Sequence, residues 1–97
     1  MAIVTHGHPG GMTMDLYEEG NRRLRESGAF QVPEHMFHAC YGDPNDLQIF
    51  GVWQTREAWD RFWNESCRPI MVEMGYDTSF TVYEVHSLFA IGQLAEH

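Results

Sequence analysis

Alternating apolar positions and short clusters of turn residues predict a chain of four strands. The first strand is ended by the turn sequence Pro-Gly-Gly at 9–11. The second and third strands are separated by Gly-Asp-Pro-Asn-Asp at 42–46, a composition typical of a tight hairpin connection. The fourth strand is predicted to be unusually long. The predicted strands cover 3–6 (or 3–8), 34–41, 47–53 and 80–89.

Apolar residues that recur every three or four positions predict two helices. Thr13 is expected to cap the first helix, over 14–27, and Gly28 lies where a C-terminal glycine belongs. Thr55 is expected to cap the second helix. That helix is predicted to be interrupted at 66–69 and followed by a short helical piece that ends at Gly75. Its apolar side consists of Ala58, Trp59, Phe62 and Trp63.

The order strand, helix, strand, strand, helix, strand is typical of the α+β ferredoxin-like (βαββαβ) fold. We expect a four-stranded antiparallel sheet with both helices on one face, formed by a single domain over 1–97. In such a sheet the first and third strands are central. The last strand then lies beside the first, and the second lies beside the third.

The predicted strands have apolar residues on both faces. In the third strand Leu47, Ile49 and Trp53 share one face, whereas Phe50 and Val52 share the other. Two helices cover only one face, so we expect a second copy of the chain to cover the other and close a barrel with the helices outside. The alternative is that these aromatic side chains are exposed on a monomer.

Composition excludes several classes of partner. The 97 residues include 6 arginines, no lysine and 14 acidic residues, which gives a net charge of −8. Such a charge disfavours binding to nucleic acid and to anionic membrane surfaces. No apolar run is long enough for a membrane span. Cys40 and Cys67 form no CxxC pair, so we expect a reduced, cytoplasmic protein.

Two segments, together with the order of elements, resemble a known family. They are residues 52–59 (Val-Trp-Gln-Thr-Arg-Glu-Ala-Trp) and 83–86 (Tyr-Glu-Val-His). They resemble the dimeric α+β barrel proteins, and most of all the small antibiotic-biosynthesis-monooxygenase-like members. The resemblance implies a homodimer with a ligand pocket between the sheet and the helices of each subunit. Members include cofactor-free monooxygenases, polyketide cyclases, isomerases, haem-degrading enzymes and stress proteins, so the resemblance leaves the reaction open.

Histidines on apolar strands are the candidate catalytic groups, because an imidazole exchanges protons near neutral pH. We expect His38 and His86 to face the pocket, with His6 beside His86 and Tyr83 as a donor to a substrate oxyanion. His35 has the opposite parity to His38, so in a regular strand the two cannot enter one cavity. A β-bulge between Met36 and Cys40 would reverse the side on which His38 lies. The alternative is that these are buried histidines bonded to backbone groups.

Aromatic and methionine side chains are expected to bind a flat substrate, although core packing is the alternative for each. The candidate substrate-binding residues are Trp53, Trp63, Phe62, Tyr17, Met36 and Tyr41.

We expect no cofactor and no metal. His6 and His8, with His86 or Glu84, could ligate a transition metal, but they complete no ligand motif. Haem-binding relatives take their axial histidine from a helix, and neither predicted helix contains one. The sequence therefore predicts cofactor-independent acid–base chemistry (monooxygenation, cyclisation or isomerisation) on an aromatic or polyketide-like small molecule. The alternatives are a non-catalytic ligand-binding or stress-response barrel and a haem- or metal-binding barrel.

Overall fold

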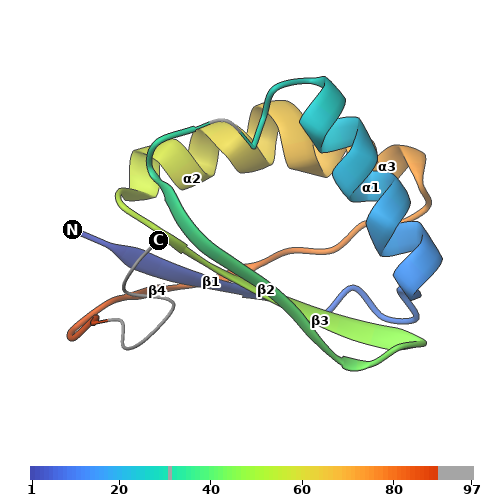
Figure 1. Cartoon of the computed structure of the whole chain (residues 1–97), viewed down its shortest axis with the longest axis horizontal. Coiled ribbons are helices and arrows are strands. Elements are labelled where there is room, and N and C mark those ends of the chain that lie inside the picture. Colours follow the sequence, from blue (N-terminus) through green and yellow to red (C-terminus); the bar gives the residue numbers. More distant parts are fainter. Residues whose placement is uncertain (31, 90–97) are drawn as a thin grey trace.

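The protein is described by a computed structural model that covers residues 1–30 and 32–89. Its strands form one antiparallel sheet in the order β2-β3-β1-β4, and all helices lie on the same side of it (Figure 1). The elements are β1 Ile3–Gly7, α1 Met14–Glu26, β2 His35–Asp43, β3 Asp46–Trp53, α2 Arg56–Phe62, the π-helical turn η1 Trp63–Cys67, α3 Arg68–Glu73 and β4 Thr81–Glu84. The predicted ferredoxin-like α+β fold, with the first and third strands central, is confirmed.

Both helix N-termini have the predicted caps. The hydroxyl of Thr13 accepts a hydrogen bond from the backbone N–H of Leu16 at 3.4 Å, and that of Thr55 accepts one from Ala58 at 3.1 Å. The predicted interruption after α2 is a π-helical turn, so the helical path continues into α3. Pro69 lies near the start of α3, directly after this turn, and has no N–H to donate back to it.

The predicted long last strand is wrong, since β4 has four residues. β4 pairs with β1 antiparallel, with Glu84 opposite Ile3, and the N–H of Val85 donates to the carbonyl of Ala2 at 3.0 Å. The ladder ends where its partner ends.

β2 contains an irregularity that decides which side chains lie under the helices. His35 pairs with Trp53, but Phe37 pairs with Val52, so Met36 is an extra residue on β2. Such a bulge shifts the alternation of side chains by one position. His35 therefore lies on the same face as His38, which is opposite Gly51 in the register.

The core lies between the helices and the sheet. Buried side chains from all layers meet there, including Ile3, Leu24, Trp53, Trp59 and Phe62. The opposite face of the sheet carries none of the helices (Figure 1). Within 1–30 and 32–89, no helix combines the length and the apolar character needed to cross a membrane.

Candidate functional site

A cavity of about 60 Å³ lies between α1, the α2–α3 run and the sheet. Its walls are mostly apolar, with Leu16 and Leu24 from α1, Ile49 and Trp53 from β3, and Phe62 from α2. A water molecule needs about 10–15 Å³ on this measure, so the cavity has room for only a few water molecules. The few polar side chains that line this cavity are therefore the candidate functional groups.

His35 is one of these polar groups. Its ring stacks on the indole of Trp53, with 4.2 Å between centroids and 7° between planes. Its Nε2 atom is buried and has no hydrogen-bond partner among residues 1–30 and 32–89. Burial, and then the charge of His38, lower the pKa of His35 to about 4, while a backbone hydrogen bond with Phe37 acts in the opposite direction. The imidazole of His35 is therefore neutral at physiological pH.

His38 and Tyr17 form a second polar group, at the rim of the cavity. The Tyr17 hydroxyl and Nε2 of His38 are 2.6 Å apart, a short hydrogen bond between α1 and β2. Removal from water lowers the pKa of His38. Burial also raises the pKa of Tyr17, against smaller opposing effects of Asn21 and Arg25. Both groups are uncharged near pH 7, and the tautomer of His38 decides which of them donates the hydrogen bond.

The two imidazoles are arranged at right angles. The rings of His35 and His38 lie 5.8 Å apart at 88°, and Phe30 contacts both, with centroids 5.9 and 6.0 Å away. An outer groove of about 390 Å³ begins at the same residues and extends along Asn21, Arg25, Met36 and Phe37. A ligand that enters the cavity from this groove would pass both histidines.

Four of the ten residues predicted for the site line the cavity: Tyr17, His38, Trp53 and Phe62. Met36 is the bulge residue; it is half exposed and lines the outer groove instead. Trp63 is absent from the cavity wall; it stacks on Trp59 and packs against the core. Tyr41 lies on the open face of the sheet, in contact with Phe50.

The predicted position of His86 in the cavity is wrong, because β4 ends at Glu84 and His86 is exposed. Tyr83 pairs with Val4 on the open face of the sheet and is 57% exposed. His6 alternates along β1 with residues whose side chains are buried. Its Nε2 atom forms a hydrogen bond with the side chain of Gln48 at 3.0 Å. The three residues therefore lie outside the cavity that contains His38.

The histidines considered as metal ligands have separate partners. Nε2 of His8 lies 3.0 Å from a carboxylate oxygen of Asp46, while His6 bonds Gln48. In the part of the chain that the structure describes, no three His, Cys, Asp or Glu side chains gather in a metal-binding arrangement. Both cysteines are free thiols. Burial raises the pKa of Cys67, which lines the cavity, to about 12, so this thiol is protonated.

Sequence reasoning missed His35. The alternation of a regular strand places His35 and His38 on opposite faces, and the bulge at Met36 brings them together. A run of two histidines three residues apart on one strand is the signal that could have raised the question, since only a bulge lets both side chains enter one cavity.

Comparisons with known proteins identify the fold. No family model and no curated protein matches the sequence. Among solved structures, SnoaB, a cofactor-independent oxygenase from Streptomyces nogalater, matches with a TM-score of 0.63 and 11% identity, over 90% of this chain and 94% of SnoaB. Two candidate antibiotic biosynthesis monooxygenases match over 95% of this chain. The protein from Chloroflexus aurantiacus has a TM-score of 0.61 and 16% identity, and 100% of its own chain is covered. The protein from Deinococcus radiodurans has a TM-score of 0.60 and 14% identity, and 99% of its own chain is covered. The resemblance found in the sequence is thus confirmed at the level of fold: the chain has the ferredoxin-like α+β fold of the antibiotic-biosynthesis-monooxygenase type.

Proposed function

We propose that this protein is a small-molecule enzyme in which His38 removes a proton from a flat, enolisable or phenolic substrate without a cofactor. The observation that carries the proposal is the short Tyr17–His38 hydrogen bond at the rim of an apolar cavity. The shared fold with SnoaB, described as a cofactor-independent oxygenase, supports the same class of chemistry.

The site is suited to proton abstraction because its base is uncharged before the reaction. In the tautomer whose Nε2–H donates to the Tyr17 oxygen, Nδ1 of neutral His38 can accept a proton from a substrate C–H or O–H group, and the imidazolium and the substrate anion then form together. The Tyr17 hydroxyl lies next to the new charges and can donate to the developing oxyanion. Trp53 and Phe62 supply flat apolar surfaces for the substrate ring.

The fate of the substrate anion separates the members of this reaction class. Attack on molecular oxygen would make the protein a monooxygenase. Attack on an internal carbonyl would make it a cyclase, and protonation at another carbon an isomerase. All three begin with the same proton transfer, so the first test should measure that step alone.

Hydrogen–deuterium exchange of an enolisable aromatic ketone, 2-tetralone, in D₂O tests the proton transfer. We expect the protein to accelerate exchange at the carbon next to the carbonyl, and His38→Ala to lower this rate by a factor of about 100 or more. His86→Ala is the matched control, because His86 is an exposed histidine outside the cavity. Exchange that is unaffected by His38→Ala, or equally lost in His86→Ala, would refute the role of His38. Binding without exchange would instead indicate a non-catalytic binding protein.

We also propose that the protein is a homodimer joined through the open face of the sheet. This face carries a row of aromatic side chains. Phe37 and Phe50 pack together at 5.5 Å, and Tyr41 and Tyr83 are 42% and 57% exposed. Contiguous apolar surface of this kind is rare on monomers. Light scattering at micromolar concentration should give twice the chain mass, and Phe50→Glu should give the monomer mass. A monomer in the unmodified protein would contradict the proposal.

A further inference from the structure

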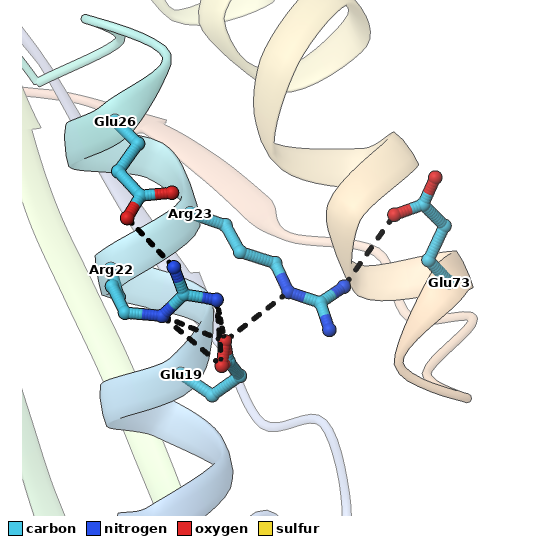
Figure 2. A network of polar contacts seen from close by, with 5 residues as sticks. All are labelled: Glu19, Arg22, Arg23, Glu26 and Glu73. Atoms are coloured by element: carbon cyan, nitrogen blue, oxygen red, sulfur yellow. Dashed lines mark hydrogen bonds and ion pairs between the residues drawn. The ribbon is translucent and has the colours of Figure 1, made fainter.

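The outer groove is lined by an arginine that has no ion-pair partner in the described part of the chain. Three arginines follow one another closely on α1, and two of them are paired. Arg22 contacts Glu19 and Glu26, and Arg23 lies 3.5 Å from carboxylate oxygens of both Glu19 and Glu73 (Figure 2). Arg25 makes no ion pair with any residue of 1–30 and 32–89, and it lines the groove that begins at the two histidines.

The position of Arg25 couples it to the reacting groups. Its positive charge acts on the Tyr17 hydroxyl, whose pKa it lowers. The groove that it lines shares Asn21, His35 and His38 with the cavity. In a chain with a net charge of −8, an unpaired guanidinium at this entrance is a local exception that favours an anionic ligand group.

At the inner end of the site, Nε2 of His35 requires a hydrogen-bond donor. The backbone bond of His35 with Phe37 must use Nδ1, because Nε2 has no partner. A neutral imidazole carries one N–H, so Nε2 presents a lone pair. A buried acceptor without a donor is costly, and a ligand hydroxyl would satisfy it.

We propose that the ligand of this site is an aromatic hydroxy acid, whose carboxylate binds Arg25 in the outer groove and whose hydroxyl donates to Nε2 of His35. The inference rests on the proposed function and narrows its substrate class. The ring lies between these two ends, against Phe30 and Trp53, and passes the Tyr17–His38 pair.

Calorimetric binding of three related ligands tests both ends of the site. The probes are 6-hydroxy-2-naphthoate, 2-naphthol (without the carboxylate) and 2-naphthoate (without the hydroxyl). We expect 6-hydroxy-2-naphthoate to bind roughly tenfold to a hundredfold more tightly than 2-naphthol, as a charge-assisted hydrogen bond would give. Arg25→Gln should abolish this preference. Arg61→Gln should retain it, because Arg61 is equally free of ion pairs within the described ranges and lies on α2, outside the groove.

The hydroxyl end is tested by His35→Phe, which should abolish the preference for 6-hydroxy-2-naphthoate over 2-naphthoate and keep the preference for a carboxylate. An Arg25→Gln protein that still prefers the carboxylate, or an unmodified protein that binds none of the three probes, would overturn the inference. These Kd values require no turnover. If His38→Ala left the exchange of 2-tetralone intact, the proposed function would fail while the ligand preferences still decided this inference.

Discussion

Replacing His35 by phenylalanine should stabilise the fold while it damages the site. The unmodified protein buries Nε2 of His35 without a partner, and an unsatisfied buried polar atom costs about 1–3 kcal/mol. Phenylalanine keeps the stacking on Trp53 and removes that atom. It also loses the bond with the Phe37 backbone, which contributes about 1 kcal/mol. The expected net gain is about 1 kcal/mol at pH 7, which raises Tm by roughly 4–8 °C in a domain of this size.

The same substitution should change how stability depends on pH. His35 has a pKa of about 4 in the folded chain, below its ordinary 6.5, so the unfolded chain binds more protons between these values. Stability therefore falls as the pH drops from 6.5 to 4, and it is fully retained above 6.5. From pH 7 to pH 5 the full shift is equivalent to about 2 kcal/mol, or about 1 kcal/mol after allowance for the partial exposure of the ring.

Urea unfolding at pH 7 and pH 5 measures both effects. Carboxylates titrate in the same range, so the informative quantity is the difference between the unmodified protein and His35→Phe. The groups that face His35 are His38 and the aromatic rings of Phe30, Trp53 and Phe62, and only His38 among them titrates near this range. The variant should gain a further 1 kcal/mol or so over the unmodified protein at pH 5. Lower stability of the variant at pH 7, or parallel pH profiles, would refute the description of His35 as a buried neutral imidazole.

Three further substitutions test the geometry around the cavity. Tyr17→Phe should change the free energy of unfolding by less than about 1 kcal/mol, since its bond to His38 is exposed, but slow the exchange of 2-tetralone about tenfold; unchanged exchange would remove Tyr17 from the mechanism. Gly20→Ala should raise the free energy of unfolding by about 0.8–1.0 kcal/mol, because the new Cβ would lie 3.6 Å from the nearest atom, the sulfur of Met74 directly after α3. A loss in urea unfolding would contradict this. Gly7→Ala should lower it by about 1–3 kcal/mol, since the Cβ would lie 2.5 Å from the ring of Phe80; a neutral result by thermal unfolding would show that the ring moves away freely.

Local signals made the fold predictable. Thr13 and Thr55 each precede a helix with apolar periodicity, and each caps the helix that begins after it. The turn at 42–46 joins β2 and β3 because its residues suit a tight connection and little else. These features depend on a few neighbouring residues, so a single sequence contains them in full.

Which residues of β2 face the cavity depends on tertiary contacts, and local sequence patterns do not contain these contacts. Strand parity predicts that Met36 shares a face with His38, whereas the register places His35 there. The decisive fact is which residue of β2 packs against Trp53 of β3. The imidazole of His35 stacks on this indole, and Phe62 contacts both rings. These tertiary contacts compete with regular pairing. The predicted length of β4 was wrong because apolar residues continue to Phe89, whereas the pairing with β1 stops at Glu84 opposite Ile3.

The small volume of the cavity is compatible with a naphthalene-sized ligand because its walls differ in stiffness. Ligand sites commonly measure about 300–1,000 Å³, well above the 60 Å³ present here, so binding must displace side chains. The displaceable wall consists of methionines from the loop before α1 and from the end of the helical run: Met12, Met71 and Met74. Methionine is unbranched and repacks at little cost. On the opposite wall the rings of His35, Trp53 and Phe62 are in mutual contact, and these aromatic side chains have few rotamers. Expansion on the methionine side therefore makes room for the ring of a ligand without moving the two histidines, whose spacing the chemistry requires.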